Sequence, residues 1–228
     1  MNKICIIGVG PGAIEYVVPV ALRRIKDADC LIGAQRALDL FPRFKKEKVC
    51  FDGRLSRVIP YLKKRREDKK IAVLVSGDPG LYSLAQTIAK QFKNNEYEVI
   101  PGISSLQLAF ARIGESWQDV KIISLHGRKI DQENLGAKES IKRTENRQKV
   151  IAEGDFLADI RNSSKIFIFT DNDFTPNVIA EFLLKQGIKN RRAVVLENLS
   201  YPEERIVDSD LKKLSEMKGF GLCVMIIL

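Results

Sequence analysis

Largely apolar runs and amphipathic segments take turns along the first half of the chain. The apolar runs are short and have few polar positions, which is typical of buried strands in a parallel sheet; they lie at residues 3–9, 30–33, 71–75 and 97–100. Segments that favour helices lie between and after them, at residues 19–27, 36–40, 58–66, 81–92 and 104–112. Because strands and helices alternate, we expect an α/β domain over residues 1–113.

The pattern changes after a predicted linker at residues 114–119. Four further strands are predicted, at residues 121–125, 165–170, 192–196 and 222–228, with helices at 174–186 and 208–216. These elements predict a second α/β domain over residues 120–228. Within it, residues 129–161 are polar and rich in Lys, Arg, Glu, Gln and Asn, so we interpret them as a helical insertion or flap outside the core.

The composition is that of a folded protein that does not enter a membrane. Of 228 residues, 45% are hydrophobic and 29% charged, enough to bury a sizeable core. No apolar run reaches the length of a membrane span, and the N-terminus has no signal-peptide pattern. The four cysteines are not spaced as metal ligands, so we interpret them as reduced thiols of the core and expect no metal site and a cytoplasmic location.

The formal net charge of +9 has more than one explanation. Nucleic acid and a substrate with many carboxylates would both attract it. Much of the excess, however, lies in short basic runs at residues 63–66, 69–70 and 138–149, which are typical of solvated faces or a loop. These runs contain almost no aromatic residues, which single-stranded nucleic-acid sites generally use for stacking, so we expect no nucleic-acid partner.

Three glycine-rich loops each follow a predicted strand. Their sequences are GVGPG at residues 8–12, SGDPGL at 76–81 and PGISS at 101–105. Loops at the carboxyl ends of parallel strands meet at one edge of the sheet, and the start of a helix there offers backbone N–H groups to a polar ligand. The three loops together therefore predict one shared ligand site.

Each loop also has a simpler interpretation. Residues 8–13 fit the dinucleotide pattern GxGxxA, but Pro11 and Gly12 interrupt the expected helix start and no acidic residue ends the strand at 30–33. The first loop could also be a structural turn. Asp78 alone could cap a helix that begins near Leu81, and Ser104 could be a helix N-cap.

The loops stand in a set that resembles a known family. With the sequences SLHGR at residues 124–128, TD at 170–171 and ENLSYP at 197–202, all in this order, the chain is similar to the tetrapyrrole methylases, which use S-adenosylmethionine. The first and last of these three sequences resemble the branch that methylates C-5 of cobalt-precorrin-7 (precorrin-6Y) in cobalamin synthesis. The resemblance implies the class III methyltransferase fold: two α/β domains with the cofactor in the cleft between them, in a homodimer.

The resemblance also implies functional residues. By position, the cofactor contacts fall on Pro11, Asp78, Leu81, Ser104, Ser105, Thr170 and Glu197. Since the substrate carries many carboxylates, arginines should bind it, and by position we favour Arg36 and Arg128, with Arg112 next. A sulfonium donor is already activated, and alignment can contribute roughly 7–11 kcal/mol, so no strong base is required. Asp78, His126 and Glu197 are weak candidates for collecting a proton.

The implied reaction is a single methylation. Some relatives carry a fused second methyltransferase that acts on C-15 and removes a carboxyl group; no such domain fits here, so a separate enzyme is expected for that step. The alternatives are a superfamily member that acts on another corrin intermediate or on ribosomal RNA, and a non-catalytic nucleic-acid-binding module. The charged stretch between Arg128 and Lys165 is longer than expected for this branch, which makes the match there unreliable.

Overall fold

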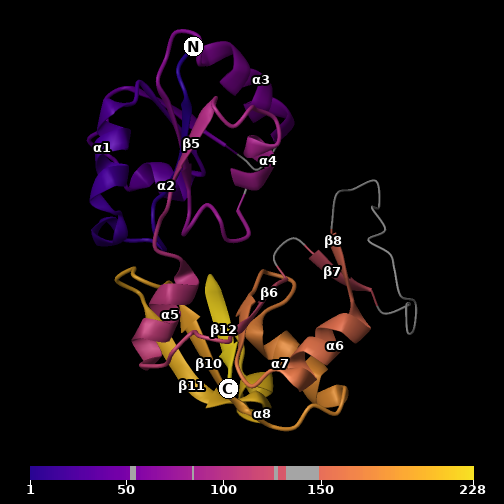
Figure 1. The fold of residues 1–228 in the computed structure, drawn as a ribbon. Helices are drawn as coiled ribbons and strands as arrows, with labels where there is room; N and C mark the ends of the chain where they lie inside the picture. Colours follow the sequence, from indigo (N-terminus) through magenta and orange to yellow (C-terminus); the bar gives the residue numbers. More distant parts are fainter. Residues whose placement is uncertain (52–54, 84, 126–127, 132–148) are drawn as a thin grey trace. The chain divides into compact units, whose positions relative to one another are not determined.

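The computed structural model describes residues 1–51, 55–83, 85–125, 128–131 and 149–228. The chain forms two compact units, Met1–Leu108 and Ala109–Leu228, which we describe one at a time (Figure 1). The division falls inside helix α5 (Ser105–Ile113), whereas the domain limits expected from the sequence lay at residues 113 and 120.

The first unit is built on a five-stranded parallel sheet. Its order is β3-β2-β4-β1-β5, from strands β1 (Ile4–Gly8), β2 (Cys30–Gly33), β3 (Glu47–Cys50), β4 (Ile71–Val75) and β5 (Tyr97–Ile100). The four strands predicted from apolar runs are confirmed. Strand β3 was not predicted, because this edge strand alternates half-buried and exposed residues and has no apolar run.

Helices cover both faces of this sheet. Helices α1 (Pro19–Asp27) and α2 (Gln35–Asp39) pack on the face that carries Ile7, Leu31 and Leu74. Helices α3 (Leu55–Arg65) and α4 (Ala85–Ala89) pack on the opposite face, against Ile6, Ile32 and Val73, as Figure 1 shows. A single 3-10 turn, η1 (Ile14–Tyr16), precedes α1. This arrangement is a three-layer α/β/α unit.

The second unit has a mixed sheet. Its order is β11-β10-β12-β9-β6, from strands β6 (Lys121–Ser124), β9 (Ile166–Phe169), β10 (Arg192–Glu197), β11 (Arg205–Asp210) and β12 (Cys223–Ile227). Strands β6 and β9 pair in parallel, and the other neighbours pair antiparallel. The prediction missed β11 and assigned its last residues to a helix; α8 begins only at Leu211, after the N-cap Asp210.

Three helices of the second unit pack on one face of its sheet: α6 (Glu153–Asn162), α7 (Pro176–Lys185) and α8 (Leu211–Glu216). The interpretation of residues 129–161 as lying outside the core is wrong for α6, because Phe156, Leu157 and Ile160 are buried in that core. Strands β7 (Arg128–Asp131) and β8 (Lys149–Ala152) form a separate two-stranded parallel sheet (Figure 1).

No helix in the described part of the chain is long and apolar enough to cross a membrane. All four cysteines are free thiols. Cys30 and Cys223 are buried and Cys5 is half-buried, but the interpretation as a core thiol is wrong for Cys50, which is exposed on the edge strand β3.

Candidate functional site

The three glycine-rich loops lie at one edge of the first unit's sheet. They follow β4, β1 and β5, which are neighbours in the sheet and run in the same direction. The first two loops are joined by a backbone bridge, in which the N–H of Gly77 donates to the carbonyl of Gly10 at 2.8 Å. The prediction that the loops share one edge of the sheet is confirmed.

The loops approach so closely that two glycines have no room for a side chain. A Cβ on Gly8 would lie 2.6 Å from the carbonyl oxygen of Gly77 and 2.7 Å from the nitrogen of Gly102. A Cβ on Gly102 would in turn meet the same Gly77 oxygen and the backbone of Gly8. Glycine at these positions therefore lets three backbone segments touch, which concentrates peptide N–H and C=O groups at one place.

Asp78 connects two of the loops through hydrogen bonds. Its Oδ1 accepts from the N–H of Gly80 at 2.7 Å, and its Oδ2 accepts from the N–H of Gly102 at 3.0 Å. The alternative of a helix cap is wrong, because α4 begins at Ala85, whose N–H donates to the Ser83 hydroxyl at 3.2 Å. Asp78 thus holds the loop at residues 76–81 against the loop at residues 101–105.

Ser104 caps the helix that opens at this edge. Its hydroxyl oxygen accepts from the N–H of Gln107 at 3.1 Å, and the Gln107 side-chain oxygen accepts from the N–H of Ser104 at 2.9 Å. This reciprocal pair is a capping box, and Ser105 is the first residue of α5. The N-cap interpretation of Ser104 is confirmed, and it holds the start of α5 at the ligand loops.

The remaining predicted residues of the first unit also lie on these loops or beside them. Pro11 and Leu81 are half-buried, and the Leu81 N–H donates to the Asp78 carbonyl at 3.2 Å. Arg36 lies on α2, is exposed, and donates from Nη2 to the Ser76 hydroxyl at 3.5 Å. The structure therefore puts a solvent-facing guanidinium at the rim of the second loop.

Directly after the loop at residues 76–81 lies a residue with an unusual backbone that the sequence did not indicate. Tyr82 has a φ of 47°, a left-handed conformation that is rare for a bulky residue, and its side chain is 50% exposed. This backbone geometry also explains why α4 starts later than the predicted residue 81. Nothing in the sequence pattern signals it.

Thr170 and Glu197 lie at strand ends in the second unit. Thr170 follows β9, and its hydroxyl donates to the carbonyl of Cys223 at 2.6 Å. Glu197 ends β10 and is only 4% exposed; its carboxylate accepts from the N–H of Gly221 at 2.8 Å and pairs with Arg205. That carboxylate therefore already has a cation and a backbone donor as partners inside its own unit.

The segment after β10 contains two residues with a left-handed backbone and is held by a half-buried acid, Glu204. Asn198 and Ser200 have φ values of 48° and 69°. Glu204 accepts from the Ser200 N–H at 2.6 Å and from Arg112, whose Nε and Nη2 lie 2.6 and 3.3 Å from its two oxygens. Burial alone would raise the pKa of Glu204, but these hydrogen bonds hold it below its usual value. The Nε and Nη2 atoms of Arg112 are thus already bound to Glu204, a residue of the same unit.

Two predicted residues cannot be placed in this way. His126 lies outside the described residues. Arg128 is the first residue of β7, but its side chain also lies outside the described part. Among the residues that the structure describes, no group of three or more His, Cys, Asp or Glu side chains could hold a metal ion.

Comparison with known proteins places this geometry in a family. Residues 3–215 match the model of the Tetrapyrrole (Corrin/Porphyrin) Methylases. A probable cobalt-precorrin-7 C(5)-methyltransferase of Methanocaldococcus jannaschii is 35% identical over 93% of this chain and 91% of its own length. The cobalt-precorrin-7 C(5)-methyltransferase of Salmonella typhimurium is 31% identical over 88% of this chain and 87% of its own length.

A solved structure supports the fold independently of sequence similarity. The uroporphyrin-III C-methyl transferase of Thermus thermophilus, crystallised with S-adenyl homocysteine, superimposes with a TM-score of 0.76. The alignment covers 99% of this chain and 97% of that one, at 18% sequence identity. The predicted class III methyltransferase fold is therefore confirmed.

Proposed function

Since the chain belongs to the tetrapyrrole (corrin/porphyrin) methylases, we propose that it methylates C-5 of cobalt-precorrin-7 (precorrin-6Y) in cobalamin biosynthesis, with S-adenosylmethionine as the methyl donor. The two relatives from Methanocaldococcus jannaschii and Salmonella typhimurium are named for this activity, which supports the proposed specificity. The observation in the structure that carries the proposal is the contact of three loops at Gly8, Gly77 and Gly102, because it brings three strand-end loops and the start of α5 together at one edge of the sheet, where a cofactor with charged and hydroxyl groups can bind.

The residues at this edge fit such a cofactor. S-Adenosylmethionine supplies an electrophilic methyl group on a sulfonium. Pro11 and Leu81 offer apolar contact beside the glycine backbone, and Ser104 and Ser105 bring the start of α5. Asp78 acts through the loops that it connects, and its negative charge also favours a sulfonium nearby. From the second unit we propose Thr170 and Glu197 as further contacts.

Arginines at the site are proposed to bind the carboxylates of the tetrapyrrole. Arg36 is exposed at the rim of the 76–81 loop and can form a bidentate pair with a substrate carboxylate. Arg128 is proposed from its position in the sequence. Arg112 ranks below both, because Glu204 already occupies its Nε and Nη2.

Catalysis then depends on alignment more than on a base. In the proposed transfer a bond would form between C-5 and the methyl carbon as the carbon–sulfur bond breaks, and the products would be the methylated ring, S-adenosylhomocysteine and a proton that leaves C-5 for the solvent. The carboxylates of Asp78 and Glu197 each accept hydrogen bonds from backbone N–H groups, and the proposed transfer uses neither of them as a base. Holding donor and acceptor in line can contribute roughly 7–11 kcal/mol.

The biological setting is part of the same proposal. We propose a homodimer in the cytoplasm, with a separate enzyme for methylation and decarboxylation at C-15, because both relatives are named for C-5 alone.

An acceptor test separates this function from its rivals. Purified protein would be incubated with methyl-labelled S-adenosylmethionine and, in parallel, cobalt-precorrin-7, other corrin intermediates and ribosomal RNA. Label should enter the cobalt-precorrin-7 fraction. Label in RNA, or in another corrin only, would contradict the proposed substrate, and failure to bind S-adenosylhomocysteine in calorimetry would contradict the methyltransferase assignment.

A further inference from the structure

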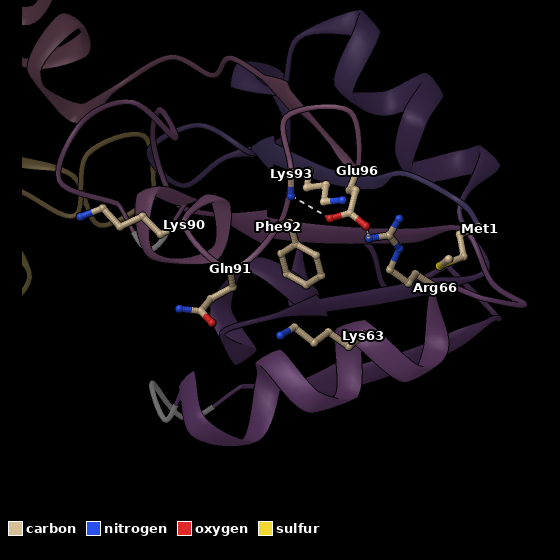
Figure 2. Close-up of a pocket in the computed structure, with 8 residues that line it drawn as sticks. All are labelled: Met1, Lys63, Arg66, Lys90, Gln91, Phe92, Lys93 and Glu96. Atoms are coloured by element: carbon tan, nitrogen blue, oxygen red, sulfur yellow. Dashed lines mark hydrogen bonds and ion pairs between the residues drawn. The ribbon is translucent and has the colours of Figure 1, made fainter.

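A basic pocket lies at the opposite edge of the first unit's sheet from the ligand loops. It has a volume of about 520 Å³ and is lined by Met1, Lys63, Arg66, Lys90, Gln91, Phe92, Lys93 and Glu96 (Figure 2). Met1 precedes β1, Arg66 precedes β4, and the residues from 90 to 96 precede β5. All of these segments come before the amino ends of parallel strands, so the pocket is separate from the site described above.

Arg66 is the centre of this pocket and is nearly buried. Its side chain is 7% exposed, its Nη1 lies 2.8 Å from Glu96 Oε1, and its guanidinium carbon lies 5.7 Å from the centre of the Phe92 ring. The carboxylate and the ring together fix the plane of the guanidinium. In the described part of the chain, this contact with Glu96 is the only side-chain hydrogen bond of Arg66, and its Nε is buried without an acceptor.

Two other arginines in this protein show what the Nε–Nη2 edge of a guanidinium can bind. Arg112 and Arg192 each donate from Nε and Nη2 to both oxygens of one carboxylate, Glu204 and Asp208. This edge is the one that grips an oxyanion with two parallel hydrogen bonds. Arg66 has the same edge, held in place and nearly buried, but no oxyanion on it.

Lysines give the pocket a net positive charge. Lys63, Lys90 and Lys93 are exposed, and in the described part of the chain none of their ammonium groups has a hydrogen-bond or ion-pair partner. Glu96 is the one acid among the lining residues, and it is already paired with Arg66. In Figure 2, the Lys93 side chain lies beside Glu96 and Arg66, whereas the ammonium ends of Lys63 and Lys90 point away from Arg66.

We propose that this pocket is a binding site for a phosphate-bearing small molecule, with the guanidinium of Arg66 as the fixed cation at its centre. A phosphate group carries more charge than a single carboxylate and has three acceptor oxygens, so it suits a pocket that combines a fixed guanidinium with lysines in its lining. Lys63 and Lys93 supply the long-range attraction. Lys63 also lies in the last turn of α3, where a cation offsets the helix dipole, so the test changes it together with Lys93.

The test is calorimetric titration of the full chain with inorganic pyrophosphate at constant ionic strength, with and without saturating S-adenosylhomocysteine. Wild-type protein should bind one equivalent in both conditions. The double variant Lys63→Gln/Lys93→Gln should bind at least about tenfold more weakly, because two of the attracting charges are gone. Arg66→Lys, which keeps the charge beside Glu96 but loses the planar edge, should also lose about tenfold.

The matched control is Lys26→Gln/Lys45→Gln, which removes the same charge from exposed positions of the first unit outside the pocket. It should leave pyrophosphate affinity unchanged, and all variants should keep the wild-type affinity for S-adenosylhomocysteine. Three results would overturn the site: no saturable binding by wild-type protein, equal weakening in both double variants, or wild-type affinity in Lys63→Gln/Lys93→Gln. None of these results depends on whether the proposed methylation is correct.

Discussion

Asp78 accepts a hydrogen bond from the backbone N–H of Gly102 at 3.0 Å, across 24 residues of sequence. The same carboxylate holds the N–H of Gly80 at 2.7 Å with its other oxygen. One side chain thus fixes the loop after β4 against the loop after β5. It makes the shape of the candidate cofactor site depend on a single acid.

Asp78→Asn should weaken binding of S-adenosylhomocysteine and lower stability. An amide has one acceptor oxygen, so one of the two N–H partners loses its acceptor, and a hydrogen bond to a charged group contributes about 1.5–3 kcal/mol. Calorimetry and chemical denaturation would measure the two effects. Asp68→Asn, at an exposed position after α3, is the control and should change neither. Wild-type affinity in Asp78→Asn would remove the residue from the site.

Gly8→Ala should disturb the site more than its size suggests. The new Cβ would lie 2.6 Å from the Gly77 oxygen, so the loops must separate, and overpacking of this kind costs typically about 1–3 kcal/mol. We expect a lower melting temperature and a larger loss of S-adenosylhomocysteine affinity than Asp78→Asn causes. Gly221→Ala, where a Cβ meets no atom within 4 Å, is the matched control. Equal behaviour of the two variants would show that the close approach is unimportant.

Arg36→Ala should raise KM for the tetrapyrrole while cofactor affinity and stability stay unchanged. Arg36 is exposed beside Ser76, and losing one charge-assisted contact to a carboxylate costs about 1.5–3 kcal/mol, or roughly tenfold to a hundredfold in kcat/KM. Arg36→Lys should recover only part of this, since an ammonium cannot form the bidentate pair.

Arg112→Ala provides the contrast for Arg36. It leaves the carboxylate of Glu204, 18% exposed, without its cation, so stability should fall by about 1 kcal/mol or more. If Arg36→Ala lowered stability and left KM unchanged, Arg36 would be structural. Steady-state kinetics and denaturation on both variants decide this.

Glu47 should give the protein an acid-sensitive component of stability. Hydrogen bonds from Lys69 and Tyr61 lower the pKa of Glu47 from 4.5 to about 2. Since the folded-state pKa is the lower one, the stabilisation is fully present above about pH 4.5 and is lost as the pH falls towards 2. Denaturation of wild type and Glu47→Gln at several pH values should show a stability difference that shrinks below pH 4.5; a constant difference would contradict the assignment.

Apolar runs predicted the sheet of the first unit because its central strands are buried on both faces. Strand β3 was not predicted because it lies at the edge of the sheet. Its residues, among them Glu47 and Lys48, are half-buried or exposed and form no apolar run. Strand β11 was missed for a similar reason, since four of the six residues in its sequence, RIVDSD, are polar. Residues 129–161 looked uniformly polar, and this average concealed the apolar face of α6 at Phe156, Leu157 and Ile160.

The sequence predicted where the site lies in the fold, but not which hydrogen bonds and ion pairs hold its residues. Glycines after strands indicate a ligand edge, and Ser104 followed by Gln107 is a readable cap. Which backbone N–H groups the Asp78 carboxylate accepts from, and that Glu204 occupies Arg112, depend on tertiary distances across 24 and 92 residues. The left-handed backbone of Tyr82 has no sequence signal, because a bulky residue rarely adopts this conformation.

The position of the transferred methyl group tests the central claim most directly. Cobalt-precorrin-7 would be incubated with the protein and S-adenosylmethionine carrying a ¹³C-labelled methyl group, and the product examined by NMR. The account predicts one new labelled methyl per ring, bonded to C-5, with formation of one equivalent of S-adenosylhomocysteine. A labelled methyl at any other carbon, or none transferred by protein that binds S-adenosylhomocysteine, would contradict it.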